Sequence, residues 1–359
     1  MIILGIETSC DETALCVLEV QGRGENFEYK IRGNIVHSQI ELHKEYGGVY
    51  PALAKREHIK NLPILFEQIK KETRVEEKDI EAIAVTQGPG LEPALWTGIA
   101  FAEDFGKLHD VPIIPINHME GHIVSTLLFD SKPHQNFKKL KPFELPALAV
   151  LISGGHTEIV NIEALGAYKV LGRTRDDAVG EAFDKVARML GLPYPGGVQI
   201  SALAEEARTE NLPETITLPR PMIHSKDLDF SFAGLKTAVL YFLKNTGEPT
   251  LDMKKEIARE FEDAVTEVII SKTRTALESS GYKMLIIGGG VIANRHIREA
   301  FEELASTFTI PLYLPVSGLS GDNALMIALA GALATTGNFP SKTKGPSGIK
   351  AQGNLSLES

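Results

Sequence analysis

The chain has 359 residues, of which 43% are hydrophobic and 23% charged, and its formal net charge is −10. This length suits two lobes that each bury a core, and no apolar run is long enough to span a membrane as a helix. The acidic balance argues against a protein that binds nucleic acid alone, because phosphate contacts require Lys and Arg. Two cysteines, Cys10 and Cys16, cannot make a disulfide framework and indicate reduced thiols in a cytoplasm.

The first half of the sequence alternates apolar strands with amphipathic helices after an opening pair of strands. We expect strands at residues 2–7, 13–20, 31–38, 80–86 and 111–116, and helices at 53–69 and 94–108. The opening pair encloses the polar turn "TSCDE", and the last strand leads directly into "HMEGH". Because the chain starts with an apolar strand and has no basic leader, no signal peptide is expected.

The second half repeats this order of elements. We expect strands at 146–153, 158–165, 168–174, 284–290 and 311–315, and helices at 177–190, 231–243, 254–279, from 293 and from 322. The pattern predicts two hairpin-led α/β lobes with a ligand cleft between them. We assign residues 1–117 plus 323–340 to the first lobe and 118–322 to the second, and we expect the polar residues 341–359 to form a flexible tail.

The stretch "NHMEGHIVSTLL" places His118 and His122 four residues apart. On a helix they share one face, since four residues advance the chain by about 400°. A metal site and two ordinary helix histidines are equal alternatives on this pattern alone. A zinc protease would need H-E-x-x-H, but here Met119 follows the first histidine and Glu120 lies about 200° round the helix. The spacing therefore disfavours a metalloprotease.

An acidic residue at the head of a helix is the natural third ligand. In "SGLSGDNALMIA", Asp322 follows the predicted strand "PLYLP" and precedes a predicted helix. Asp322 could instead cap that helix, a role that contributes about 1 kcal/mol. Two histidines and one carboxylate suit Fe(II) with open coordination positions, or zinc with a bound water. We expect one divalent metal, and these three residues alone do not choose between Fe(II) and Zn(II).

Three glycine-rich loops, "LISGGHT", "PYPGGVQIS" and "IIGGGVIANR", favour a nucleotide-like ligand. The first and third end predicted strands, where backbone N–H groups can approach an anion, and the third also opens a helix whose N-terminus suits phosphate. Each loop alone could be a plain turn. None matches a P-loop or a strand-linked G-x-G-x-x-G, so neither a P-loop nor a dinucleotide-binding fold is expected.

Acidic residues gather in two further places. "ETSCDET" carries Glu7, Asp11 and Glu12 beside hydroxyl groups, which could order a metal-bound phosphate or simply form a solvated turn. "RDDAVGEAFDK" places Asp177 and Asp184 on one helical face, for which an exposed acidic surface is the alternative.

Nine motifs follow one another along the chain: "GIETSCDET", "GPG", "HMEGH", "SGGHT", "GEAFDK", "YPGG", "DFSFAGLKT", "GGGVIANR" and "GDNALMIA". In this order they resemble the TsaD family of tRNA-modifying transferases, over residues 2 to 337. The His in "SGGHT" resembles the bacterial form. The resemblance implies the actin-like ATPase fold, shared with sugar kinases, in which two RNase H-like lobes enclose a ligand cleft.

The resemblance also implies an activity and a set of site residues. The activity is transfer of the threonylcarbamoyl group from threonylcarbamoyl-AMP to N6 of adenosine 37 in tRNAs that read ANN codons. Metal ligands are implied at His118, His122 and Asp322. Contacts with the adenylate-type ligand, threonylcarbamoyl-AMP or ATP, are implied at Leu151, Ile152, Ser153, Gly154, Gly155, Asp184, Gly197 and Asn294. We expect Asp11 to accept the proton or to orient a metal-bound water.

The family implies partners as well as a substrate. We expect tRNA, a small paralogous TsaB-like subunit and a TsaE-like ATPase subunit, in a cytoplasmic protein without a membrane contact. The Lys-rich stretches "NFKKLKPF" and "SKTKGPSGIK" are the expected local contacts with tRNA. A sugar-kinase-like ATPase or a noncatalytic subunit of the same fold is the alternative. The paired histidines disfavour the kinase, and the complete set of metal ligands disfavours the noncatalytic subunit.

The sequence departs from the family pattern at five positions. Ser201 stands where some relatives have a ligand-contacting acid, and Leu151 stands where archaeal relatives have a metal-bound tyrosine, which leucine cannot replace. Glu92, Trp96 and Arg173 lie in stretches that differ from the commoner motifs. We expect these three departures to alter partner contacts or ligand affinity.

Overall fold

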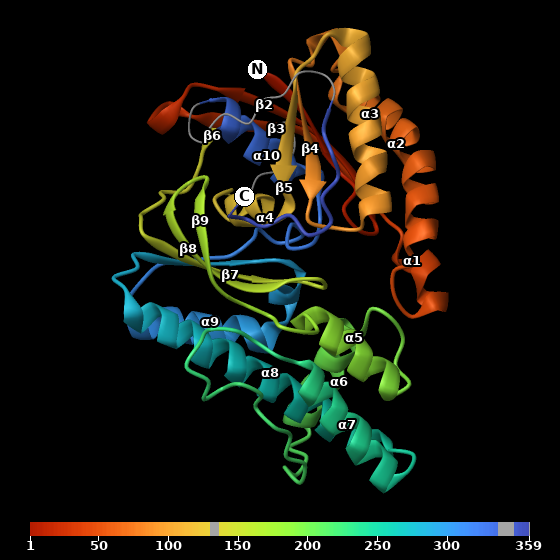
Figure 1. Ribbon diagram of the computed structural model, residues 1–359, viewed down its shortest axis with the longest axis vertical. Helices are drawn as coiled ribbons and strands as arrows, with labels where there is room; N and C mark the ends of the chain where they lie inside the picture. The colour runs from red at the N-terminus through yellow and green to blue at the C-terminus, as the bar shows by residue number, and fades with distance from the viewer. Residues whose placement is uncertain (130–135, 337–347, 359) are drawn as a thin grey trace.

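The computed structural model describes residues 1–129, 136–336 and 348–358. Two β-sheets lie one beyond the other along the long axis of the molecule, and helices cover both faces of each sheet (Figure 1). Within the described residues, no helix has both the length and the apolar character that a membrane span requires.

The first sheet has six strands in the order β5-β4-β1-β2-β3-β6. They are β1 (Ile2–Glu7), β2 (Glu12–Gln21), β3 (Glu28–Ser38), β4 (Ala82–Gly88), β5 (Ile113–Asn117) and β6 (Lys138–Lys139). β1, β2 and β3 form an antiparallel meander, and β4 and β5 extend the sheet parallel to β1. The two-residue strand β6 pairs with the edge of β3, so residues 138–139 belong to the first sheet.

The second sheet, ordered β11-β10-β7-β8-β9, repeats this arrangement. Its strands are β7 (Ala147–Ile152), β8 (Thr157–Ala164), β9 (Ala167–Arg173), β10 (Met284–Gly288) and β11 (Leu312–Tyr313). β7, β8 and β9 form the antiparallel meander, and β10 and β11 run parallel to β7. The same order and the same directions in both sheets confirm the predicted pair of hairpin-led α/β lobes.

Helices cover the two faces of the first sheet. They are α2 (Pro51–Thr73), α3 (Glu92–His109), α4 (His118–Ser125) and α10 (Ala324–Thr335), while the short helix α1 (Ile40–His43) precedes α2 in the chain. Along β1, Leu4 and Ile6 pack beneath α2 and α3, whereas Ile3 faces α10, as the two-residue period of a strand requires. Gly5 allows α10 to approach closely, since a Cβ there would lie 2.5 Å from the Ala324 carbonyl oxygen.

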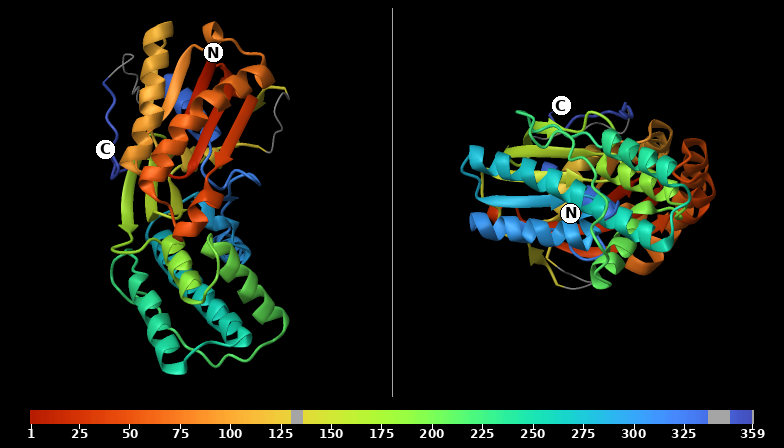
Figure 2. Two further views of the ribbon diagram at one scale, coloured as in Figure 1. Left: turned by 90° about the vertical axis from the view of Figure 1, so that its right-hand side faces the viewer. Right: turned by 90° about the horizontal axis from the view of Figure 1, so that it is seen from below.

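The second sheet is covered mainly by the remaining helices. They are α5 (Val179–Met189), α6 (Gly196–Thr209), α7 (Ala233–Thr246), α8 (Leu251–Ser279) and α9 (Arg295–Phe308). Figure 2 shows α6, α7 and α8 at the end of the molecule opposite the first sheet. Residues 148, 150 and 152 of β7 face this helical layer, and residues 147, 149 and 151 face α4.

Helices α4 and α10 pack against each other between the two sheets (Figure 1). Gly121 of α4 lies at their contact, where an added Cβ would be 3.1 Å from side-chain atoms of Met326 and Ile327. All eight residues of α4 are buried. The short helix is therefore held by both lobes, which fixes the residues that it carries.

The end of the described chain, residues 348–358, packs along both lobes. Ile349 is buried beneath α2 and α3, and Leu357 is buried beside Met119 under the second sheet. Backbone bonds join Gln352 N to the Gln87 carbonyl at 3.0 Å and Gly90 N to the Gly353 carbonyl at 3.0 Å. The expectation of a flexible tail therefore does not hold for residues 348–358, while residues 341–347 and 359 lie outside the described residues.

The other expected elements are present, and three short or glycine-rich ones were not predicted. The strand β6 and the helix α1 have two and four residues, too few for a periodic pattern. Helix α6 begins inside the loop "PYPGGVQIS", where Pro and Gly suggested only a turn.

Candidate functional site

The first two predicted metal ligands lie on one face of α4. Strand β5 ends at Asn117, whose side-chain oxygen accepts hydrogen bonds from the backbone N–H groups of Met119 at 2.9 Å and Glu120 at 3.4 Å. This N-cap starts the helix at His118, so His122 falls one turn later. The two imidazole rings lie 4.8 Å apart at an angle of 88°.

The structure places Asp322 beside both rings. Its Oδ1 lies 3.3 Å from His118 Nε2 and 3.2 Å from His122 Nε2. The alternative role of Asp322 as a helix cap is wrong, because the side chain of Asn323 caps α10 by accepting from Met326 N. Asp322 is therefore free to face the histidines, and we call His118, His122 and Asp322 the triad.

The triad fits a divalent metal. His122 is fully buried, and among the described residues neither of its ring nitrogens has a hydrogen-bond partner, although Nε2 faces the carboxylate of Asp322. A buried nitrogen without a partner is costly unless something else satisfies it. The three side chains offer two nitrogens and one oxygen within 4.8 Å of one another, a donor set typical of iron(II) or zinc.

The charged groups of the triad shift one another's pKa values. Burial raises the pKa of Asp322, but the neighbouring His118 and His122 outweigh this effect and hold that pKa well below its ordinary value. Burial lowers the pKa of His118, but the carboxylates of Asp322 and Glu7 outweigh it and raise that pKa well above the usual range. A metal would have to displace the imidazole proton that these carboxylates stabilise.

Glu7 orients His118 from the opposite side. Its Oε2 lies 2.9 Å from His118 Nδ1 and accepts a hydrogen bond from the Thr86 hydroxyl at 2.7 Å. Glu7 is fully buried at the end of β1. With its proton on Nδ1, His118 presents the lone pair of Nε2 to the triad, as metal-bound histidines usually do. The sequence pattern grouped Glu7 with the loop acids and missed this role.

Asp11 is buried in the turn between β1 and β2. Its side chain is not part of the triad, but its charge contributes to raised pKa values on both sides of the cleft. Burial, Asp11 and Asp322 raise the pKa of Glu12 to about 10. Burial raises the pKa of Asp184 on α5, although the backbone N–H groups of Gly196 and Gly197 oppose the shift, and the charge of Asp11 adds to it.

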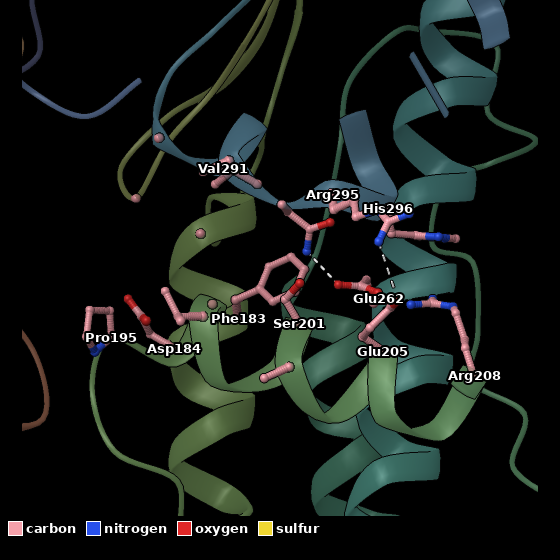
Figure 3. Close-up of a pocket in the computed structure, with 18 residues that line it drawn as sticks. Phe183, Asp184, Pro195, Ser201, Glu205, Arg208, Glu262, Val291, Arg295 and His296 are labelled. Atoms are coloured by element: carbon pink, nitrogen blue, oxygen red, sulfur yellow. Dashed lines mark hydrogen bonds and ion pairs between the residues drawn. The ribbon is translucent and has the colours of Figure 1, made fainter. Parts of the chain in front are cut away.

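The second lobe contains a cavity of about 450 Å³ (Figure 3). Of the predicted ligand contacts, four line it: Gly154, Asp184, Gly197 and Asn294. Ser201, one of the departures from the family pattern, lies in the same wall. The apolar surface of the cavity comes from Phe183, Val198, Ala202 and Val291.

The remaining predicted contacts lie at the end of β7. Leu151 and Ile152 are fully buried, and their side chains pack into the cores on either face of the second sheet. Only backbone atoms of these two residues could reach a ligand. Ser153 starts the following turn, in which its hydroxyl accepts from His156 N at 3.1 Å.

The turn at residues 153–156 borders the cavity at Gly154 and lies within electrostatic range of the triad at His156. Gly154 lines the cavity and packs on the first turn of α5, where a Cβ on Gly180 would lie 2.8 Å from the Gly154 Cα. Burial lowers the pKa of His156 to about 4, with further lowering by the charges of His118 and His122. His156 is therefore within electrostatic range of the triad, and Gly154 in the same turn borders the cavity.

Polar contacts fix the two ends of the cavity (Figure 3). At one end, Asp184 accepts from Gly196 N at 2.7 Å and so holds the first turn of α6. At the other end, the fully buried Glu262 accepts from Asn294 Nδ2 and from Arg208. These residues are positioned by each other, which keeps the cavity open between α5, α6 and α9.

Glu120 has a structural position. It is buried and accepts a hydrogen bond at 3.1 Å from the hydroxyl of Tyr168 on β9. It therefore lies away from the triad, as its spacing predicted. Its partner comes from another segment, which spacing within α4 could not reveal.

Comparison with known proteins identifies the family. The model of the TsaD family, tRNA N6-adenosine threonylcarbamoyltransferase, matches residues 30–329. Two relatives carry that name. The one from Polynucleobacter necessarius subsp. necessarius (strain STIR1) is 43% identical over 99% of this chain and 98% of its own. The one from Paraburkholderia xenovorans (strain LB400) is 45% identical over 93% and 92%.

Solved structures of lower identity show the fold. HypF from T. kodakarensis aligns with a TM-score of 0.56 and 13% identity over 95% of this chain and 49% of its own. Component A of (R)-2-hydroxyglutaryl-CoA dehydratase from Acidaminococcus fermentans aligns with a TM-score of 0.50 and 12% identity over 93% and 96%. These neighbours confirm the expected actin-like ATPase fold. From the family match and the near full-length relatives, the chain belongs to the TsaD family of tRNA N6-adenosine threonylcarbamoyltransferases.

Proposed function

We propose that this chain transfers the threonylcarbamoyl group from threonylcarbamoyl-AMP to N6 of adenosine 37 in tRNAs that read ANN codons. The observation that carries the proposal is that the cavity and the triad adjoin the same segments. Gly154 of the turn at residues 153–156 and Gly290 both line the cavity, and a Cβ on Gly288 would lie 3.3 Å from the Cβ of His122. A nucleotide in the cavity would direct its acyl end along this turn toward the triad. The relatives' shared name supports the same reaction.

Glycines in the cavity loops support a nucleotide ligand. A Cβ on Gly154, Gly155 or Gly290 would meet no atom within 4 Å in the part of the chain that the structure describes, and none of the three has a positive φ that would demand glycine. The folded chain alone therefore does not need glycine there. A ligand whose phosphate approaches the backbone N–H groups would need it. The apolar side chains of Phe183 and Val291 suit the flat face of a base.

The residues of the chain would carry out distinct parts of the transfer. N6 of adenosine attacks the acyl carbon, the bond from that carbon to the AMP oxygen breaks, and N6 loses a proton, which we assign to Asp11. The backbone N–H groups of Gly154 and Gly155 would hold the phosphate that leaves as AMP, whereas the N–H of Ser153 donates to the His156 carbonyl at 2.9 Å. Because N6 is a weak nucleophile, orientation in the cleft should account for much of the rate.

We propose Fe(II) rather than zinc as the metal of the triad, because two imidazoles and one carboxylate with open positions suit it. His118 and His122 would bind through Nε2 and Asp322 through a carboxylate oxygen. The chemistry that a divalent metal supplies when bound there is Lewis-acid polarisation of an acyl oxygen. Elemental analysis of protein purified without oxygen would distinguish iron from zinc. Zinc at full occupancy, with unchanged transfer activity, would contradict the assignment of Fe(II).

The substrate and partners follow from the same proposal. With a net charge of −10, the isolated chain should bind tRNA weakly, and a TsaB-like subunit and a TsaE-like ATPase should be required for efficient transfer. Within the Lys-rich stretch "NFKKLKPF", Lys141 is already engaged, since its ammonium donates to the Thr126 carbonyl and lies over the Tyr313 ring. Lys342 and Lys344 of the second stretch lie outside the described residues.

We also propose that residues 1–117 with 323–340, and residues 118–322, act as two lobes that close on the ligand, and that the protein acts in the cytoplasm. Cys10 and Cys16 are free thiols, which supports a reducing compartment. The packing of α4 on both sheets supports a role as the connection between the lobes.

The deciding experiment is a reconstituted transfer assay. Purified chain, threonylcarbamoyl-AMP and unmodified tRNA are incubated with and without the two partner subunits, and the nucleosides of the digested tRNA are separated. We expect threonylcarbamoyladenosine only when this chain is present, and at a higher rate with the partners. Formation of the product by the partners alone would contradict the proposal.

A further inference from the structure

The turn that carries Asp11 is held at three successive carbonyl groups. The donors are Leu91 N to the Ser9 carbonyl at 2.8 Å, His58 Nε2 to the Cys10 carbonyl at 3.0 Å, and Gln39 N to the Asp11 carbonyl at 3.0 Å. Two of these donors are backbone groups from neighbouring segments. The third, the imidazole of His58 on α2, is the only side chain among the three and can be replaced without altering the backbone.

The contacts of His58 define its tautomer. A carbonyl oxygen can only accept, so Nε2 carries the proton that bonds to Cys10. Nδ1 then accepts, and it lies 2.8 Å from the Thr13 hydroxyl and 3.3 Å from Gln39 Nε2. Full burial lowers the pKa of His58 and keeps the ring neutral. Every polar atom of the ring is thus committed, which leaves the ring one orientation.

The held turn faces the reaction centre through two side chains. The hydroxyl of Ser9 lies 3.2 Å from His118 Nδ1. Asp11, two residues later, is close enough to the cleft to contribute to the raised pKa of Asp184 on the opposite lobe. A shift of the Cys10 carbonyl would therefore move both side chains relative to the triad.

We propose that His58 is a positioning residue for the transfer reaction: its Nε2–H holds the Cys10 carbonyl and so fixes the turn that presents Ser9 and Asp11 to the cleft. The kinetic part of this inference rests on the proposed function. The structural part, that His58 immobilises the turn, does not.

Three substitutions separate the hydrogen bond from simple packing. The side-chain amide of His58→Gln can reach the place of Nε2, whereas that of His58→Asn reaches only the place of Nδ1, and His58→Ala has no donor. We expect Ala and Asn to lower kcat by about tenfold to hundredfold, the cost of a small misplacement, with KM for threonylcarbamoyl-AMP and metal content unchanged. Gln should recover most of kcat.

The thiol of Cys10 reports on the turn without any need for activity. Cys10 is partly exposed and Cys16 is fully buried, so alkylation by iodoacetamide can be followed at Cys10 with Cys16 as an internal control. We expect faster labelling of Cys10 in His58→Ala and His58→Asn than in wild type or His58→Gln. Asn61→Ala, a buried change one turn further along α2, should leave labelling unchanged.

The outcomes distinguish the possibilities. The inference would be overturned if Cys10 in His58→Ala were labelled at the wild-type rate. In that case activity would fall only in proportion to a lower Tm, and His58→Gln would not recover it. Faster labelling in His58→Ala, together with no transfer by the wild-type protein and its partners, would support the role of His58 in holding the turn and overturn the proposed function.

Discussion

At the scale of single residues, the triad depends on a carboxylate that no local pattern identifies. Glu7 ends β1, 111 residues before His118, and reaches it only because β1, β4 and β5 lie side by side. The histidine spacing and the acid before α10 were visible in the sequence. The roles of Glu7, His58 and Tyr168 were not visible, because each residue acts through a contact between segments that are far apart in the chain.

Replacing Glu7 should weaken the metal site. Glu7→Gln keeps the shape but removes the charge that orients His118, and we expect metal affinity to fall by about 10- to 100-fold. Competition with a chelator measures this change. Glu12→Gln is the control, since a pKa of about 10 makes Glu12 neutral at pH 7 and the substitution replaces one neutral group by another. Equal losses in both variants would show that the contact between Glu7 and His118 is not what sustains metal affinity.

Two polar residues of α4, Glu120 and His122, should respond differently to substitution. Glu120→Gln can still accept from Tyr168, so metal content should stay unchanged and transfer should fall less than tenfold, about 1.4 kcal/mol or less of barrier. His122→Ala removes a buried ligand and should abolish metal binding and nearly all transfer. Elemental analysis and the transfer assay test both. A loss of several orders of magnitude in Glu120→Gln with metal retained would reopen a role for Glu120 in the chemistry.

At the scale of elements, hydrophobic periodicity predicted the longer strands and helices, because each packs an apolar face on a core. It missed α6, whose first turn carries two glycines after a proline. The reason for one of these glycines lies in the packing. A Cβ on Gly196 would lie 2.5 Å from the Cβ of Ala187 and 2.7 Å from the Cα of Asp184, so only glycine lets α6 start against α5.

Two glycine substitutions should therefore affect different properties, one ligand binding and the other stability. Gly290→Ala places a methyl group in open space beside the cavity, and we expect an unchanged Tm and weaker binding of an adenylate ligand. Gly196→Ala forces α5 and α6 apart, and we expect a loss of about 1–3 kcal/mol in the free energy of unfolding. Thermal unfolding and calorimetric titration with a nonhydrolysable adenylate analogue test the pair. Undiminished ligand binding by Gly290→Ala would argue that the ligand does not approach this loop.

At the scale of the whole molecule, the segment 348–358 ties the two lobes to the helix of the triad. The side-chain amide of Asn117, the N-cap of α4, donates to the Ser356 carbonyl at 3.0 Å. Two departures from the family pattern also meet this segment: Glu92 accepts from Gly353 N at 3.4 Å, and Arg173 lies 3.9 Å from Glu358. Polar composition alone suggested a loose tail, because two buried apolar side chains carry little weight in such a stretch.

Removing either apolar anchor should destabilise the fold. Ile349→Ala and Leu357→Ala each empty a buried site, and we expect each to lower the free energy of unfolding by about 2–4 kcal/mol. Asn354→Ala, at an exposed position of the same segment, should change it by less than about 0.5 kcal/mol. Urea unfolding followed by circular dichroism provides the values. Stability equal to wild type in both anchor variants would mean that the segment does not stay docked in solution.

The packing of α10 on β1 also sets the order in which the protein can be made. Nearly the whole chain separates these two elements, and residues leave the ribosome in sequence order. Until α10 has emerged, Ile3 and the rest of one face of the first sheet have no cover, and His118 and His122 have no Asp322. The triad is therefore complete only in the final stage of folding, and a metal bound by all three of its residues could stabilise the chain only then.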